Sequence, residues 1–119
     1  MHRILIVDDS PVIRLKLKQL CEKFSLTVAG EASNGEEAVK LYKLRKPELV
    51  LMDMNMPEMS GIEAVEEILS IDPNARILII SGDAKDFNVR QALLKGVKGY
   101  ILKPIEETKL YNAIYKALE

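Results

Sequence analysis

Residues 4–9 read Ile4-Leu5-Ile6-Val7-Asp8-Asp9, a run of bulky apolar side chains that ends on two acids. Three later apolar runs also end on a polar residue. They cover residues 49–52, 77–80 and 100–102, and they end at Asp53, Ser81 and Lys103. Short apolar runs without alternation are typical of strands buried on both faces of a parallel sheet. Ligands bind outside the carboxyl ends of such strands, so we expect these polar residues to meet in one pocket.

Helical patterns alternate with the apolar runs along the whole chain. Helix starts are indicated by Ser10 before Pro11, by Ser33-Asn34-Gly35, and by Ser60 with Glu63. The expected strands cover residues 4–7, 26–32, 49–52, 76–80 and 99–102, and the expected helices cover 11–24, 35–44, 61–71, 86–96 and 106–118. Five alternating pairs predict an α/β fold with a parallel sheet and right-handed crossovers. A chain this short fits the flavodoxin-like strand order 2-1-3-4-5, with helices on both faces.

Composition narrows the class of protein. The 119 residues carry a net charge of −1, with 48% hydrophobic and 29% charged residues, so we predict one globular domain over residues 1–119. This charge balance argues against direct nucleic acid contact, and no apolar stretch approaches the ~20 residues that cross a bilayer. The single cysteine, Cys21, is predicted to be a buried apolar residue, and one cysteine without a signal peptide indicates a cytoplasmic protein.

The polar residues at the strand ends predict a specific chemistry. Three carboxylates in one pocket (Asp8, Asp9 and Asp53) repel one another unless their pKa values rise or a cation neutralises them. A hard divalent cation such as Mg²⁺ takes oxygen ligands, and together with Lys103 it balances the three negative charges. Such a site suits phosphoryl transfer, with a carboxylate as nucleophile. Lys103 would then bind one phosphoryl oxygen and Ser81 another.

Each of these residues also has a purely structural interpretation. Asp8 and Asp9 can cap the first helix, and Asp53 can be a solvated loop acid. Ser81 can be a turn residue, and Lys103 can be a surface lysine. Their joint placement at neighbouring strand ends favours the functional interpretation over four independent coincidences.

Four segments resemble the receiver domain of two-component response regulators, and most closely its stand-alone, CheY-like chemotaxis type. The similar segments are Ile4 to Ser10, Asp53 to Gly61, Ser81-Gly82 and Lys103-Pro104. The similarity extends over essentially the whole chain, in order and at family-like spacing. It implies a CheY-like (βα)5 sandwich.

The resemblance also implies roles for individual residues. Asp53 corresponds to the phosphorylation site, which accepts a phosphoryl group from a sensor histidine kinase or a phosphotransfer protein. Mg²⁺, for which Mn²⁺ can substitute, is implied to bind Asp9, Asp53 and the backbone carbonyl of Asn55 directly, and Asp8 mainly through water. Lys103 is implied to contact the phosphoryl group and to precede Pro104 through a cis peptide bond.

A switch is implied by the same resemblance. Ser81 corresponds to a hydroxyl residue that moves toward the phosphoryl group, and Tyr100 to an aromatic residue that swings inward behind it. This motion remodels the face made by the fourth helix, fifth strand and fifth helix, which binds a downstream protein target. The family is not a class of classical enzymes, because each domain catalyses only its own phosphorylation and slow autodephosphorylation.

The partners follow from the same comparison. We expect a monomer or a phosphorylation-dependent dimer that contacts neither membrane nor nucleic acid directly. Three basic residues of the first helix, Arg14, Lys16 and Lys18, are predicted to face the kinase or, equally, solvent.

Three alternatives remain. The chain can be the receiver portion of a longer DNA-binding or enzymatic regulator. A flavodoxin needs a phosphate-binding loop after the first strand, where Asp8 and Asp9 repel phosphate. An aspartate-nucleophile phosphatase usually carries its acid motif on the first strand, whereas the segment Asp53 to Asn55 follows the third. The sequence therefore disfavours the last two.

Overall fold

Strands and helices alternate along the chain, as the sequence predicts. The computed structural model describes residues 2–56, 59–83 and 85–119. Within these residues the elements are β1 (Arg3–Val7), α1 (Pro11–Lys23), β2 (Thr27–Ala32), α2 (Gly35–Arg45), β3 (Leu49–Asp53), α3 (Gly61–Ile71), β4 (Ile77–Ser81), α4 (Phe87–Leu94), β5 (Gly99–Leu102) and α5 (Glu107–Leu118). Lys95 is the C-cap of α4 and Gly96 follows it with a left-handed φ of +105°, which confirms Gly96 as the predicted C′ glycine.

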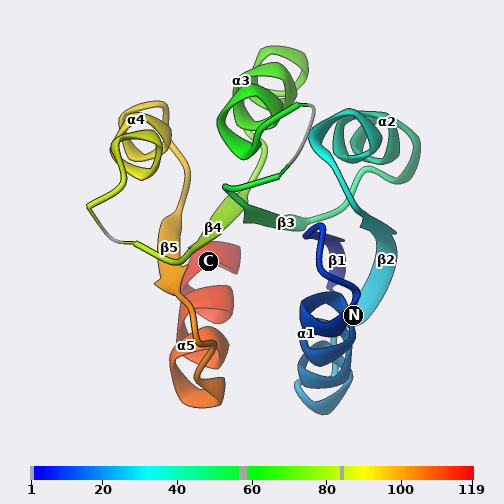
Figure 1. The fold of residues 1–119 in the computed structure, drawn as a ribbon. Helices are drawn as coiled ribbons and strands as arrows, with labels where there is room; N and C mark the ends of the chain where they lie inside the picture. The colour runs from blue at the N-terminus through cyan, green and yellow to red at the C-terminus, as the bar shows by residue number, and fades with distance from the viewer. Residues whose placement is uncertain (1, 57–58, 84) are drawn as a thin grey trace.

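The sheet has the predicted topology. Its strands are parallel and pair in the order β2-β1-β3-β4-β5. Helices α2, α3 and α4 cover one face of the sheet, and α1 and α5 cover the other (Figure 1). The flavodoxin-like α/β sandwich is therefore confirmed for the described residues.

Neighbouring residues of the central strands enter two separate apolar cores. Ile4 and Ile6 pack in the core beneath α1 and α5, whereas Leu5 and Val7 pack in the core beneath α2, α3 and α4. The strands β3 and β4 are buried at every position. Burial on both faces explains why these strands read as continuous apolar runs rather than as alternating patterns. The alternation also decides which layer each side chain at a strand end faces.

Side-chain caps begin the helices that leave the carboxyl edge of the sheet. Ser10 Oγ accepts a hydrogen bond from the backbone N–H of Ile13, with Pro11 at the first helical position of α1. Ser60 and Glu63 form the predicted capping box at the start of α3. These caps satisfy backbone donors that would otherwise lack partners, and they fix where each helix starts beside the strand ends.

Polar pairs close the opposite, amino edge of the sheet. His2 Nδ1 lies 2.6 Å from Glu48 Oε2, and the backbone N–H of Arg3 donates to Glu48 Oε1 at 3.3 Å. The hydroxyl of Tyr42 donates to Asp72 Oδ2 at 2.8 Å, which links the ends of α2 and α3. These contacts join segments that are distant in sequence.

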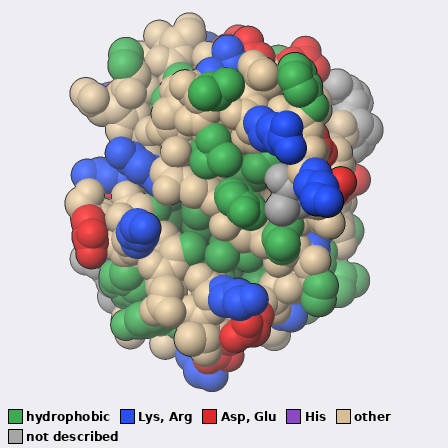
Figure 2. Space-filling model, turned by 90° about the vertical axis from the view of Figure 1, so that its left-hand side faces the viewer, with side chains coloured by type: hydrophobic (Ala, Val, Ile, Leu, Met, Phe, Trp, Pro, Cys, Tyr) green, Lys and Arg blue, Asp and Glu red, His purple; other side chains and the backbone are tan. Residues whose placement is uncertain are grey.

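The side of the molecule formed by α4 and β5 exposes several large apolar side chains. On α4 and β5 the exposed fractions are 69% for Phe87, 82% for Leu94, 41% for Tyr100 and 43% for Leu102. Figure 2, which views this side, shows hydrophobic side chains gathered among Lys and Arg. Clusters of exposed apolar side chains commonly mark protein interaction surfaces.

Two further sequence predictions concern burial and membranes. Cys21 is buried within the core under α1 and α5, as predicted, and burial raises the pKa of its thiol to about 12. In the described ranges, no helix combines the length and apolar character that crossing a membrane requires.

Candidate functional site

The strand register lines up the four predicted strand ends along one edge of the sheet. Val7 pairs with Met52, so Asp8 and Asp53 are the next residues on neighbouring strands. Ser81 pairs with Leu102, which makes Lys103 the next residue beyond β5. The site is therefore assembled by parallel pairing of segments that are up to 95 residues apart.

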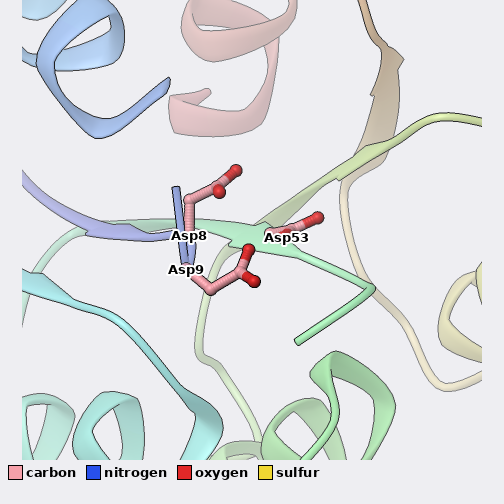
Figure 3. Close-up of side chains that lie close together, drawn as sticks. All are labelled: Asp8, Asp9 and Asp53. Atoms are coloured by element: carbon pink, nitrogen blue, oxygen red, sulfur yellow. The ribbon is translucent and has the colours of Figure 1, made fainter. Parts of the chain in front are cut away.

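Three carboxylates form the centre of the site. Asp8, Asp9 and Asp53 each present a carboxylate oxygen, and these oxygens lie within 4.8 Å of one another (Figure 3). Asp8 and Asp53 are 0% and 2% exposed, whereas Asp9 is exposed. The cluster is therefore buried on the sheet side and open to solvent at Asp9.

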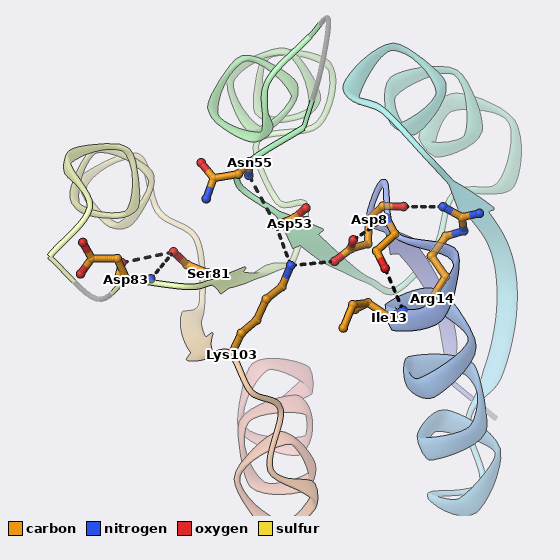
Figure 4. Close-up of polar contacts among 9 residues, drawn as sticks. Asp8, Ile13, Arg14, Asp53, Asn55, Ser81, Asp83 and Lys103 are labelled. Carbon is orange, nitrogen blue, oxygen red and sulfur yellow. Dashed lines mark hydrogen bonds and ion pairs between the residues drawn. The ribbon is translucent and has the colours of Figure 1, made fainter.

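Lys103 completes the cluster from the loop after β5. Its Nζ lies 3.3 Å from Asp53 Oδ1 and 3.2 Å from Asp8 Oδ2 (Figure 4). Its backbone N–H donates to the carbonyl of Ser81 at 2.8 Å, and its peptide bond to Pro104 is cis, as predicted. One cation thus contacts two of the three acids.

The alternation of side chains along the strands places Asp8 and Asp53 on the same face of the sheet. Asp8 continues the series Ile4 and Ile6, and Asp53 continues Leu49 and Leu51, so both point toward the layer of α1 and α5. Parallel strands present paired residues on the same face, which is why these two acids meet rather than diverge.

The charges in this pocket are not balanced. Burial, followed by the nearby carboxylate of Asp8, raises the pKa of Asp53, although Lys103 opposes this rise. Burial alone would lower the pKa of Lys103, but the carboxylates of Asp53 and Asp8 outweigh it and raise this pKa. Three acids and one lysine leave a net negative charge, which a bound cation would neutralise.

The donor set fits a hard divalent cation. Carboxylate oxygens from three residues converge, and Mg²⁺ prefers oxygen ligands. Asp8 Oδ2 is buried and has no hydrogen-bond partner among the described residues, although Lys103 lies within ion-pair distance. A buried carboxylate oxygen with spare acceptor capacity is the expected feature of a ligand site.

Ser81 lies at the predicted strand end, but its hydroxyl is engaged elsewhere. It belongs to the series Ile77 and Ile79, which faces the layer of α2, α3 and α4. Its Oγ donates to the carbonyl of Asp83 and accepts from the Asp83 backbone N–H, both at 3.2 Å (Figure 4). A hydroxyl in this position must leave Asp83 before it can contact a group bound to Asp53.

The structure also locates the remaining predicted residues. The backbone N–H of Asn55 donates to Asp53 Oδ1 at 3.4 Å, which places Asn55 beside Asp53. Tyr100 is 41% exposed and lies on β5, an edge strand of the sheet. The motif residues Pro57 and Glu58 fall outside the described residues.

Arg14, Lys16 and Lys18 make contacts that the sequence did not reveal. Arg14 donates to the carbonyl of Asp8, Lys16 donates to the carbonyl of Ile105 at 3.1 Å, and Lys18 lies 3.8 Å from Glu31. Their charged groups contact other parts of the chain, and Lys16 and Lys18 are exposed all the same, so a kinase-facing or solvated role for this helix face stays a prediction. Nothing in the local sequence signals contacts with segments this distant.

Two glycines support the loop after β3, and sequence reasoning assigned neither of them this role. A Cβ on Gly61 would lie 2.4 Å from the carbonyl oxygen of Asp53 and 2.6 Å from Cα of Met54. A Cβ on Gly35 would lie 2.6 Å from the carbonyl oxygen of Met59. Only glycine allows these backbones to approach so closely.

The chain is similar to a known family and to two chemotaxis proteins. Residues 4–115 match the family described as the response regulator receiver domain. The chain is 46% identical over 114 residues to the chemotaxis protein CheY of Thermotoga maritima, covering 96% of this chain and 95% of that protein. It is 44% identical over 117 residues to CheY of Bacillus subtilis, covering 98% of each.

Solved structures agree with the sequence relatives. The chain superposes on a protein in the CheX-CheY-BeF3-Mg²⁺ complex of Borrelia burgdorferi with a TM-score of 0.95 at 33% identity. The match covers 99% of this chain and 90% of that one.

A doubly wound parallel sheet with an acidic cluster at its carboxyl edge, together with these matches, defines a receiver domain, a family of signalling switches rather than of classical enzymes. The chain belongs to the response regulator receiver domain family of two-component signalling, and its relatives include chemotaxis proteins. Receiver domains bind Mg²⁺ through an acidic cluster, here Asp8, Asp9 and Asp53.

Proposed function

We propose that Asp53 accepts a phosphoryl group from a phosphohistidine of a sensor histidine kinase or phosphotransfer protein. The observation that carries this proposal is a nearly buried carboxylate with a lysine Nζ at 3.3 Å and two more acids within 4.8 Å. An Oδ atom of Asp53 forms a bond to phosphorus while the phosphorus–nitrogen bond breaks, and the imidazole nitrogen retains that electron pair. The product is an aspartyl phosphate.

Asp8, Asp9, Asp53 and the backbone carbonyl of Asn55 would hold Mg²⁺, and Mn²⁺ can substitute for it. When bound, the cation supplies positive charge that offsets the negative charge of the acids and of the transferring group. This role accounts for a pocket whose own residues leave an excess of negative charge.

Lys103 and Ser81 would contact the transferred group. Lys103 Nζ already lies beside Asp53, so it would bind a phosphoryl oxygen as a point charge. Ser81 would exchange its hydrogen bonds to Asp83 for one to another phosphoryl oxygen. Slow autodephosphorylation would follow when water attacks phosphorus and the Asp53 carboxylate leaves.

The exposed face of α4, β5 and α5 would carry the signal. Release of Ser81 from Asp83 would alter the segment that joins β4 to α4, and Tyr100 would move inward on the neighbouring strand. The apolar side chains exposed on α4 and β5 would then present a changed surface to a downstream protein target.

The wider setting rests on the same proposal. Residues 1–119 would form one receiver domain that acts in the cytoplasm as a monomer or as a phosphorylation-dependent dimer. The chemotaxis relatives favour a role in chemotaxis, without direct membrane or nucleic acid contact.

The test is the intact mass of the chain after incubation with acetyl phosphate, with and without Mg²⁺. We expect one phosphoryl adduct that needs Mg²⁺ and is absent in Asp53→Asn. Asp83→Asn is the matched control, because an Asn side-chain oxygen still accepts the hydrogen bond from Lys85 N–H. An adduct that persists in Asp53→Asn would contradict the proposal. Failure of the wild-type chain to form an adduct, under conditions that label a control receiver, would exclude phosphorylation of Asp53 by this small donor.

A further inference from the structure

Arg14 contacts the backbone of the acidic cluster rather than any of its carboxylates. Its Nη1 donates to the carbonyl of Asp8 at 2.6 Å (Figure 4). Its Nε lies 3.5 Å from Glu31 Oε1. The Arg14 side chain is 20% exposed, so most of it is packed between the start of α1 and the edge strand β2. One side chain therefore joins three segments around the site.

The Asp8 carbonyl belongs to the peptide group that leads into Asp9. The rest of this turn is held by the N–H of Asp8, which donates to Ala32 at 3.1 Å, and by the N–H of Ser10, which donates to Asp8 Oδ1 at 2.9 Å. The contact with Arg14 fixes the orientation of the intervening peptide plane. Asp9 follows directly on that peptide group, and it is exposed to solvent.

Electrostatics alone does not explain a guanidinium in this place. A positive charge near a cation site weakens cation binding by direct repulsion. Glu31, which also lies 3.8 Å from Lys18, offsets part of this charge from the far side. The geometry thus directs one donor of Arg14 to the Asp8 carbonyl while Nε remains paired with Glu31.

We propose that Arg14 is a positioning residue that orients the peptide between Asp8 and Asp9, so that Asp9 reaches the cation that Asp8 and Asp53 also bind. Glu31 holds the guanidinium in the required orientation. This inference rests on the proposed Mg²⁺ site, but it assigns to α1 a function that neither the acids nor Lys103 perform.

The sign of one measurement separates positioning from charge. Mg²⁺ is titrated into the wild-type chain, Arg14→Ala, Arg14→Lys and Lys18→Ala, and binding is followed by the amide NMR shifts of residues 8–10. Positioning predicts that Arg14→Ala binds Mg²⁺ about tenfold more weakly. Repulsion alone predicts tighter binding in the same variant.

Two further variants complete the design. Arg14→Lys keeps the charge but lacks the fork that reaches both partners, so we expect a smaller loss than in Arg14→Ala. Lys18→Ala removes a cation from the same helix and the same partner, Glu31, without touching the Asp8 carbonyl. It should tighten Mg²⁺ binding by at most about twofold, because an exposed charge is screened.

A measurement without metal tests the same role. Amide hydrogen exchange of Asp9 and Ser10 should accelerate in Arg14→Ala and stay unchanged in Lys18→Ala. Unchanged or tighter Mg²⁺ binding in Arg14→Ala overturns the inference, and if that variant does not fold, the same result in Arg14→Lys does so. A wild-type chain that binds no Mg²⁺ contradicts the metal site itself, and with it the role of Arg14.

Discussion

The pKa values of the acids at the two edges of the sheet shift in opposite directions. At the amino edge, Glu48 is paired with His2, and this hydrogen bond, together with that from Arg3 N–H, lowers the pKa of Glu48. At the carboxyl edge, burial and Asp8 raise the pKa of Asp53. At the first edge the acid has hydrogen-bond partners and is exposed, whereas the second edge retains excess negative charge.

This difference separates stability from function. A paired and exposed acid contributes modestly to folding and needs no ligand. Buried acids that repel one another destabilise the fold, and such strain is typical of sites that await a ligand. Four substitutions test this contrast, and they are given from the largest expected effect to the smallest.

Gly61→Ala should damage the carboxyl edge most. The added Cβ would meet backbone atoms of Asp53 and Met54, so the loop that carries the acceptor must move. We expect a loss of about 3 kcal/mol in the free energy of unfolding, measured by urea denaturation, together with weaker Mg²⁺ binding. The control is Gly82→Ala, where a Cβ meets nothing within 4 Å. Equal effects of the two substitutions would argue against the steric explanation.

Lys103→Met removes the cation that partly neutralises this edge. Asp8 and Asp53 then face each other without their nearest positive charge. We therefore expect the free energy of unfolding of the metal-free protein to fall by about 2 kcal/mol. This figure allows for the 28% exposure of the Lys103 side chain. Mg²⁺ should restore part of the loss.

The matched control for this substitution is Lys109→Met. The Lys109 side chain is 76% exposed and pairs with Glu106 within its own chain segment, so its removal should change stability by less than about 0.5 kcal/mol. If both methionine variants lose the same stability, the charge conflict at the carboxyl edge is not the cause.

Asp53→Asn should stabilise the metal-free fold at neutral pH. Because the pKa of Asp53 is raised on folding, the folded chain binds this proton more tightly than the unfolded chain. The stability that comes with the proton is therefore lost as pH rises from the ordinary Asp value of 3.8 through the raised pKa. We expect a gain of about 1 kcal/mol for the variant at neutral pH.

Thermal unfolding with a chelator, from about pH 3 to about pH 8, measures this gain. The gain should vanish below the ordinary Asp pKa, where both states hold the proton. A variant that is less stable than the wild type at neutral pH would show that Lys103 outweighs burial and Asp8 at this position.

Glu48→Gln probes the amino edge and should have the smallest effect. The pKa of Glu48 is lowered on folding. Its contribution to the free energy of unfolding is therefore present above the ordinary Glu pKa of 4.5 and is lost as pH falls through the lowered pKa. The side chains of His2 and Glu48 are both well exposed, so we expect the substitution to change the free energy of unfolding by less than about 0.5 kcal/mol at neutral pH. A double-mutant cycle with His2→Ala isolates the pair. A loss larger than the gain in Asp53→Asn would break the contrast between the edges.

The strand order, the position of each strand end and the acids that meet there were all predictable from the residues alone. The physical reason is that strands buried on both faces read as unbroken apolar runs, and parallel pairing brings their carboxyl ends to one edge. Caps such as Ser60 with Glu63 were also predictable, because both members of the contact lie within one turn. Family resemblance predicted the cis bond at Lys103-Pro104.

Contacts between distant segments that carry no local signal for each other became visible in the folded chain. The contact of Arg14 with the Asp8 carbonyl, the turn of the Ser81 hydroxyl toward Asp83 and the approach of Gly61 to Asp53 all depend on packing. The residue type shows which donors and acceptors a side chain has, but the packing of neighbouring segments decides which partners these groups contact. The raised pKa of Asp53 has the same origin, because burial and the distance to Asp8 exist only in the folded chain.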